Sequence, residues 1–170
     1  MKNIEVKVYV DNFRDIISKL KSTGAEYKGK LCQVDTYYNC KSGRLKMREI
    51  NNKKAELIFY SRPNKKGAKV SDYEILKVPE NLKQKTGETF KKALGEKVVV
   101  KKERNLWIYK NTRIHLDKVY KLGYFLELET VVKKNIEKSK KEYNEIFSFL
   151  NLDKYKKYKK SYSDMLIGKA

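Results

Sequence analysis

The sequence predicts an α+β fold dominated by antiparallel strands. Strand-like segments rich in β-branched and aromatic residues follow one another, separated by short turn signals. Three other segments show the helical spacing of apolar residues. No linker, repeat or low-complexity stretch divides the 170 residues, so we expect one domain covering residues 1–170.

The N-terminal segment is expected to form a strand followed by a helix. Alternating apolar and polar residues predict a strand from about Asn3 to Val10. Asp11 or Asn12 then caps a helix that Gly24 ends. The apolar face of this helix comprises Phe13, Ile16, Ile17 and Leu20.

The middle of the chain is expected to contain strands and one helix. Residues from about Leu31 to Val78 are strand-like. Pro79 opens a predicted helix through Leu94, with a potential break near Gly87, and Gly95 closes it. The turn signals within the strand region lie at 41–43, 51–53 and 63–67.

The last part of the chain is expected to contain three strands, a helix and a short basic tail. Val98 to Thr130 reads as three strands joined near 110–111 and 121–123. The following helix has a stripe of Ile136, Tyr143, Ile146, Phe147 and Leu150.

Composition restricts the partner and the chemistry. The net charge of +20 favours an anionic partner, and nucleic acid, acidic lipid and polyphosphate all fit; a lysine-rich composition bias also produces such a charge. Cys32 and Cys40 lack a disulfide or metal-thiolate pattern, and the single histidine, His115, argues against histidine-rich metal sites. With no signal segment or run of membrane-spanning length, we expect a cytoplasmic protein.

Charged residues alternate with apolar ones along the predicted strands, and their signs are segregated by strand. The polar positions are Asn3, Glu5 and Lys7; Arg44, Lys46 and Arg48; Lys102 and Arg104; Arg113, His115 and Asp117; and Glu127 and Glu129. Two arrangements produce this pattern: a half-exposed sheet with its charges in water, or a barrel with its polar faces turned inward. In a barrel, the cations could hold a polyphosphate, and Glu5, Glu127 and Glu129 would offer oxygen ligands to Mg²⁺ or Mn²⁺.

These motifs, in this order, resemble the CYTH superfamily of triphosphate tunnel metalloenzymes over nearly the whole chain. The segments that carry the resemblance are Asn3–Lys7, Gln33–Tyr38, Gly43–Glu49, Glu56–Pro63, Lys102–Arg104, Ile114–Asp117, Leu122–Glu129 and Ser161–Leu166. The resemblance implies an eight-stranded antiparallel β-barrel, the triphosphate tunnel, with helices packed outside. It also implies a metal-dependent reaction on a triphosphate.

The resemblance assigns roles by position. It implies that Lys7 and Asp117 act in catalysis, with Asp117 binding metal or positioning the nucleophile. The implied metal ligands are Glu5, Glu127, Glu129 and Asp117, and the implied phosphate ligands are Lys7, Arg44, Lys46, Arg48, Arg62, Lys102 and Arg104. The chain departs from the family pattern in two places: Asn3 replaces the first signature glutamate, and Ser61 occupies the register of a usual lysine, with Arg62 beside it.

The expected reaction is that of a class IV adenylate cyclase, which converts ATP to cyclic AMP and pyrophosphate. Similarity of Gly43–Glu49, Ser71–Tyr73 and Ser161–Tyr162 to the cyclase-like branch favours it. The alternative is a triphosphatase that hydrolyses thiamine triphosphate, a nucleoside triphosphate or tripolyphosphate. Both reactions fit the same set of cations and carboxylates, because both depend on positioning the triphosphate and neutralising its charge.

A non-catalytic module that binds a polyphosphate, a nucleotide or a nucleic acid is a further alternative. The basic and aromatic segment Lys154–Tyr162 is typical of nucleic-acid surfaces, although we favour the interpretation that its tyrosines pack on the barrel and its lysines face water. We expect a nucleoside triphosphate or polyphosphate as substrate, no membrane or nucleic-acid partner, and a monomer or a homodimer. His115 is interpreted as a hydrogen-bonded structural residue.

Overall fold

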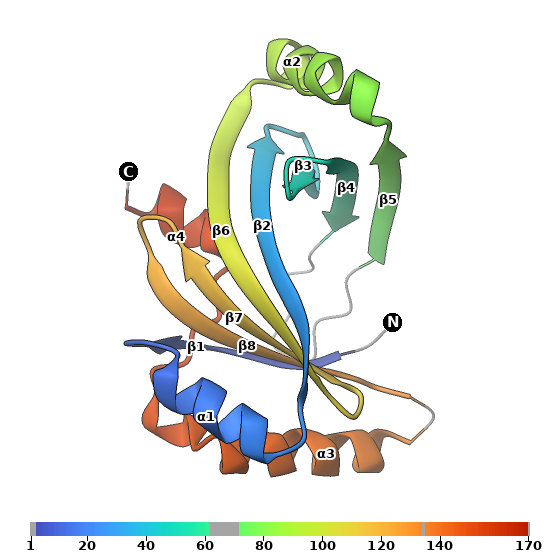
Figure 1. Ribbon diagram of the computed structural model, residues 1–170. Helices are drawn as coiled ribbons and strands as arrows, with labels where there is room; N and C mark the ends of the chain where they lie inside the picture. The colour runs from blue at the N-terminus through green and yellow to red at the C-terminus, as the bar shows by residue number, and fades with distance from the viewer. Residues whose placement is uncertain (1–2, 62–71, 134, 170) are drawn as a thin grey trace.

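The computed structural model describes residues 3–61, 72–133 and 135–169, which form one antiparallel sheet and four helices (Figure 1). The strands are β1 (Asn3–Val10), β2 (Glu26–Tyr38), β3 (Arg44–Ile50), β4 (Lys54–Ser61), β5 (Asp72–Val78), β6 (Glu96–Tyr109), β7 (Thr112–Val119) and β8 (Gly123–Val131). The helices are α1 (Arg14–Ser22), α2 (Lys83–Leu94), α3 (Ile136–Phe149) and α4 (Tyr162–Ile167), with the short 3₁₀ turns η1 (Glu80–Leu82) and η2 (Leu152–Lys154).

The sheet is strongly curled, and its strands follow the order β1-β8-β7-β6-β2-β3-β4-β5. This arrangement confirms the predicted fold class, because eight antiparallel strands enclose a concave face and α1, α2 and α3 pack on the convex face. The short helix α4 lies instead at the concave face. Among the described residues, β1 and β5 form the two ends of the hydrogen-bonded ladder and do not pair with each other. The tunnel is therefore a curled sheet and not a barrel closed by hydrogen bonds.

The main apolar core lies between the convex face of the sheet and helices α1 and α3. Figure 1 shows both helices at the end of the molecule occupied by β1, β7 and β8. Val8, Leu116 and Leu126, for example, are completely buried there against Leu20 and Ile146. Since side chains alternate along a strand, these apolar residues direct their charged neighbours to the concave face.

Helix α2 covers the other end of the convex face. Phe90 packs beside Tyr38 and Met47 of β2 and β3. The potential break near Gly87 is absent, because α2 continues from Lys83 to Leu94. Gly87 lies against β3, where an added Cβ would be in ordinary van der Waals contact with the Met47 sulfur at 3.5 Å. No helix in the described ranges is long and apolar enough to cross a membrane.

Two strands begin earlier than the sequence predicts. β2 starts at Glu26, not Leu31, and β6 starts at Glu96, not Val98. The two long strands pair with each other from Glu26 opposite Ile108 to Tyr38 opposite Glu96, so cross-strand pairing extends them through polar residues of low strand propensity.

The C-terminal tail makes backbone contacts with β1 that the sequence does not predict. The backbone N–H of Tyr9 donates to Lys156, and that of Tyr158 donates to Lys7, at 3.1 and 2.8 Å. The tail thus lies along the free edge of β1 before α4 begins at Tyr162. Tyr158 packs against Phe125 of β8, whereas the lysines between 154 and 160 are exposed. This fits the interpretation that the tyrosines of the segment pack on the sheet and its lysines face water.

Candidate functional site

The charged faces of β1, β2, β3, β6, β7 and β8 meet on the concave side of the sheet. Opposite residues of antiparallel strands point to the same face, and the register places Lys7 opposite Glu127, and Glu127 opposite His115. Asp35 and Asp117 are 2% and 0% exposed, and Lys102 is 7% exposed. These burials exclude the half-exposed sheet with its charges in water and support the inward-facing arrangement.

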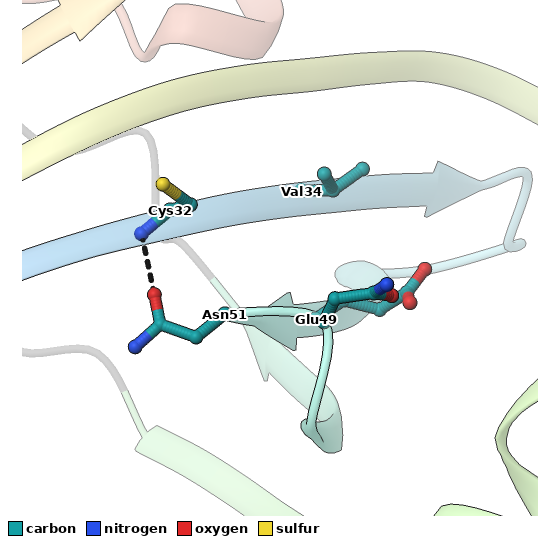
Figure 2. Close-up of a pocket in the computed structure, with 5 residues that line it drawn as sticks. Cys32, Val34, Glu49 and Asn51 are labelled. Atoms are coloured by element: carbon teal, nitrogen blue, oxygen red, sulfur yellow. Dashed lines mark hydrogen bonds between the residues drawn. The ribbon is translucent and has the colours of Figure 1, made fainter.

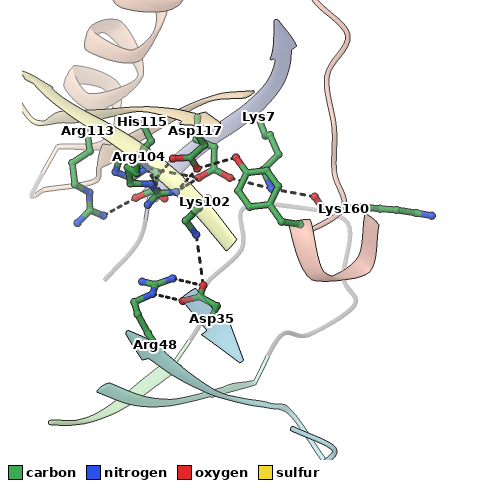
Figure 3. Close-up of polar contacts among 12 residues, drawn as sticks. Lys7, Asp35, Arg48, Lys102, Arg104, Arg113, His115, Asp117 and Lys160 are labelled. Carbon is green, nitrogen blue, oxygen red and sulfur yellow. Dashed lines mark hydrogen bonds and ion pairs between the residues drawn. The ribbon is translucent and has the colours of Figure 1, made fainter. Parts of the chain in front are cut away.

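One half of the site is built around a single carboxylate, Asp35 on β2. Arg48 of β3 donates to both oxygens of Asp35 at 2.7 and 2.8 Å, and Lys46 of β3 donates to Oδ2 at 2.9 Å. Lys102 of β6 lies 3.6 Å from the same oxygen. Figure 3 shows Asp35 between Arg48 and Lys102. Three cations therefore share one anion in a buried environment.

The pKa values of this cluster reflect the shortage of negative charge. Burial lowers the pKa of Lys46 to about 8, and it also lowers the pKa of Lys102. Burial acts to raise the pKa of Asp35, but Lys102, Arg48 and Lys46 hold it well below its usual range. The cluster is suited to an additional anion, which would favour the protonated form of both lysines.

The other half of the site contains carboxylates and cations in alternation. Arg104 of β6 donates to both oxygens of Asp117 on β7, at 2.7 and 2.6 Å, and to Glu127 of β8 at 3.0 Å. Lys7 of β1 lies 3.0 Å from the other oxygen of Glu127. Although burial alone would raise the pKa of Glu127, its neighbours His115, Lys7 and Arg104 hold it well below its usual range.

Helix α4 contributes Tyr162 to the same group. The Tyr162 hydroxyl donates to Asp117 at 2.9 Å, and the Lys7 ammonium lies 4.1 Å from the centre of the Tyr162 ring. Lys7 also donates to the backbone carbonyl of Lys160 at 3.1 Å (Figure 3). The tail therefore orients Lys7 from the side of the site where β1 has no neighbouring strand.

A second contact joins α4 to β3. Arg44 donates to the Ser161 hydroxyl at 2.9 Å and to both oxygens of Asp164 at 2.9 and 3.1 Å. Ser161 and Asp164 also form the capping box that begins α4. Since arginine binds carboxylate and phosphate with the same fork of N–H groups, Asp164 occupies the donors that a phosphate would use.

A candidate metal site lies on β7 and β8. His115, Glu127 and Glu129 place one ligand atom each within 4.8 Å of one another. The His115 Nδ1 atom is 3.7 Å from Glu127 and 3.8 Å from Glu129, and it has no hydrogen-bond partner in the described structure. Glu5 of β1 is in register with Glu129 and so faces the same side. Two carboxylates and a buried imidazole without a hydrogen bond fit a divalent ion.

Most residues implied by the resemblance lie in this one constellation. The structure brings together Lys7, Lys46, Arg48, Lys102, Arg104, Asp117, Glu127 and Glu129, and it places Arg44 at the α4 end of the concave face. Arg62 lies outside the described residues. Asp117 contacts Arg104 and Tyr162 and is not part of the His115 group.

Sequence reasoning missed four residues. Asp35 and Gln33 occupy alternate positions of β2 and are 2% and 5% exposed, and the Gln33 Oε1 atom has no partner among the described residues. Gln33, Asp35 and Tyr37 are each two residues apart, so the alternation along the strand could have placed all three on one face. Tyr162 was read only as part of a motif. His115 was interpreted as a hydrogen-bonded structural residue, but its Nδ1 atom lacks such a bond.

A separate hollow of about 440 Å³ lies on the convex side. Cys32 and Val34 of β2 line it with Glu49, Asn51 and Asn52. Figure 2 shows Asn51, whose side-chain oxygen accepts the Cys32 backbone N–H at 2.8 Å. Cys32 and Val34 alternate with Gln33 and Asp35 along β2, so this hollow faces away from the charged site.

Comparison with known proteins identifies the family and agrees with the fold. The family model of the CYTH domain matches residues 1–162. The chain belongs to the CYTH family. A "putative adenylate cyclase" of Methanocaldococcus jannaschii is 30% identical, with 97% of this chain and 98% of the relative aligned.

Solved structures show the same architecture. The PH1012 protein of Pyrococcus horikoshii superposes with a TM-score of 0.78 and is 29% identical, with 95% of this chain and 98% of that chain covered. A "putative adenylyl cyclase" of Hippeastrum, HpAC1, described as having a dominant triphosphatase activity, has a TM-score of 0.72 and 12% identity, with 99% and 96% covered. At that identity the second likeness shows the fold alone.

Proposed function

We propose that this protein is a metal-dependent enzyme that binds a triphosphate on the concave face of its sheet and converts ATP to cyclic AMP and pyrophosphate. Family membership and the name of the relative from Methanocaldococcus jannaschii support an adenylate cyclase. The triphosphate is the part of the substrate for which the site offers complementary groups.

The observation that carries this proposal is that Lys46, Arg48 and Lys102 share the carboxylate of Asp35. Buried cations without enough opposite charge are costly to a fold. Strands β3 and β6 both pair with β2 and bring these cations together around Asp35, so the site is suited to receive a further anion. A triphosphate supplies several closely spaced negative oxygens that such a cluster can match.

Each side chain then has a proposed task. Asp117 keeps Arg104 in place and orients the attacking hydroxyl, and Lys7 donates to the reacting phosphate from β1. The proposed phosphate ligands are Lys7, Arg44, Lys46, Arg48, Arg62, Lys102 and Arg104. Because phosphoryl chemistry depends chiefly on positioning and charge neutralisation, these contacts supply most of what the reaction needs.

Glu5, Glu127 and Glu129 are the proposed carboxylate ligands of the divalent ion, Mg²⁺ or Mn²⁺. When bound, the ion neutralises negative charge on the phosphate oxygens. Lys7 and Arg104 contact Glu127, so they hold that carboxylate in position. Asn3, in place of the first signature glutamate, contributes a neutral amide to this end of β1.

Hydrolysis of a triphosphate is the second candidate. HpAC1 of Hippeastrum shares the fold and is described as a dominant triphosphatase, so the architecture accommodates this reaction. In this chain the same cations would hold tripolyphosphate, thiamine triphosphate or a nucleoside triphosphate, and a water would attack the terminal phosphate.

A product assay tests the proposal. Purified protein is incubated with ATP, thiamine triphosphate and tripolyphosphate, each with Mg²⁺ or Mn²⁺, and the products are separated by chromatography. Cyclic AMP with pyrophosphate supports the cyclase, and orthophosphate supports the triphosphatase. Absence of any product with every substrate would contradict both.

A matched pair of variants assigns the activity to the concave face. Lys102 is buried and faces the site, whereas Lys101, its neighbour on β6, is exposed on the other face. We expect Lys102→Gln to lower kcat/KM at least about tenfold, since it removes a charge-assisted contact. Lys101→Gln should leave kcat/KM unchanged.

A further inference from the structure

We propose that His115 is a ligand of the divalent ion and that it makes the site select a transition-metal ion such as Mn²⁺ over Mg²⁺. This inference refines the ion site of the proposed function. It depends on the position and surroundings of a histidine that the resemblance does not place among the metal ligands.

The first step concerns the unsatisfied imidazole nitrogen. His115 is 5% exposed, and its Nδ1 atom has no hydrogen-bond partner in the described structure. Buried polar atoms are almost always satisfied, so such an atom requires an explanation. The nearest opposite groups, Glu127 Oε2 and Glu129 Oε1, lie 3.7 and 3.8 Å away, beyond hydrogen-bond distance.

The second step concerns spacing. Two ligands of one ion, each at about 2.1 Å from it, lie at most about 4.2 Å apart. Both distances from Nδ1 fall inside this limit, and all three ligand atoms lie within 4.8 Å of one another. Nδ1 is therefore too far from either carboxylate for a direct hydrogen bond but near enough to share an ion with each of them. The 4.8 Å bound exceeds the limit by about 0.6 Å, so a small shift of the carboxylates brings all three groups onto one ion.

The third step concerns the orientation of the carboxylates. Arg113 holds the Oε2 atom of Glu129 at 3.0 Å, so the Oε1 atom is the one that faces His115. Lys7 holds Oε1 of Glu127 at 3.0 Å, and Oε2 of Glu127, which accepts one hydrogen bond from Arg104 at 3.0 Å, faces His115 with its remaining lone pair. Cations on β1 and β7 thus direct one oxygen of each carboxylate towards the imidazole.

The ion preference follows from the ligand set. Mg²⁺ prefers oxygen ligands and retains bound water, whereas imidazole nitrogen suits first-row transition ions. Replacing an oxygen position by a nitrogen therefore shifts selectivity away from Mg²⁺. With Asn3 in place of a signature carboxylate, the site has fewer anionic oxygens, and the nitrogen ligand gains importance.

Pulsed electron paramagnetic resonance of the untagged protein with Mn²⁺ tests the ligand directly. Because the chain has one histidine, any imidazole-nitrogen coupling to Mn²⁺ must come from His115. We expect ¹⁴N modulation in the wild-type protein, its replacement by the ¹⁵N pattern when histidine is ¹⁵N-labelled, and its loss in His115→Gln. Bound Mn²⁺ without nitrogen coupling in the wild-type protein would overturn the proposal, whatever the folding of the variant.

Competition titrations test the selectivity. We expect Mg²⁺ to displace Mn²⁺ only at roughly 100-fold excess or more, and His115→Gln to weaken Mn²⁺ binding at least tenfold while changing Mg²⁺ binding less. Equal losses for both ions would contradict a role in selectivity. Neither experiment contains a nucleotide, so neither result depends on catalysis. If the protein shows nitrogen coupling but forms no product in the product assay, the proposed enzyme is refuted and this inference stands.

Discussion

Lys46 on β3 and Asp35 on β2 form a buried ion pair of 2.9 Å on the concave face of the sheet. The same carboxylate accepts two hydrogen bonds from Arg48 and lies 3.6 Å from Lys102. Asp35 is therefore the anion that makes the cluster compatible with folding before any ligand binds.

Replacing Asp35 by Asn should lower the free energy of unfolding by about 3–5 kcal/mol at pH 7, because it leaves two buried lysines and the partly buried Arg48 without their shared partner. Tripolyphosphate should raise the melting temperature of Asp35→Asn more than that of the wild-type protein. Thermal unfolding with and without tripolyphosphate measures both effects. Asp153→Asn, at an exposed pair with Lys157, serves as the control and should unfold like the wild type.

Triphosphate binding should weaken as the pH rises through about 8, because Lys46 loses its proton there. We expect the Kd for tripolyphosphate to rise roughly tenfold between pH 7.5 and 9.5, as one charge-assisted contact is lost. Calorimetric titration of wild-type protein and Lys46→Arg measures this, and the arginine variant should show a shallower rise since it stays charged. The groups facing Lys46 are Asp35, Tyr37, Tyr60, Arg48 and Lys102.

The same shift has a consequence for stability. The pKa of Lys46 is lower in the folded state than its ordinary value of 10.5, so the unfolded chain binds more protons between pH 8 and 10.5. This lysine therefore favours the folded state increasingly as the pH rises through that window. In the binding experiment above, an identical pH dependence of the tripolyphosphate Kd in the wild type and in Lys46→Arg would contradict the assignment of the transition near pH 8 to Lys46.

Tyr162 allows the hydrogen bond and the ring to be separated. Tyr162→Phe keeps the ring below Lys7 and removes the bond to Asp117, so it should cost about 1 kcal/mol of unfolding free energy. Tyr162→Ala also removes a buried ring and should cost about 3–5 kcal/mol. Urea unfolding distinguishes them, and equal losses would show that ring packing contributes nothing.

Asp164 should compete with phosphate for Arg44. Asp164→Asn weakens the fork-like pair, and we expect it to increase the affinity for tripolyphosphate by about fivefold at most, the value of a partly exposed ion pair. Arg44→Gln should lower the affinity. Calorimetric titration measures both, and a weaker affinity in Asp164→Asn would mean that the carboxylate supports the binding site and does not occupy it.

The sequence was sufficient to assign the faces of the strands. In β3, the alternation of Arg44, Lys46 and Arg48 with Leu45 and Met47 places the cations together, and the structure confirms this. The eight-stranded antiparallel architecture was expected only from the family resemblance, and the strand order and the curling of the sheet were not predicted. They depend on contacts between distant segments, which the local pattern does not encode.

The partners of the charged residues were harder to predict. Asp35 is flanked by Val34 and Thr36 on β2, and this local pattern does not reveal its cationic partners, which come together only when β3 and β6 pair on either side. The contact between His115 and Glu129 likewise depends on the register of β7 and β8. The helical end of the tail was missed because its six residues, Tyr162–Ile167, are too few to show helical periodicity.

The most direct test is a crystal structure with tripolyphosphate and Mn²⁺. The account predicts that the phosphates lie on the concave face, within hydrogen-bond distance of Arg48, Lys102 and Arg104, and that Mn²⁺ lies beside Glu127 and Glu129. Phosphates bound only to exposed lysines of the convex face or the tail would contradict it.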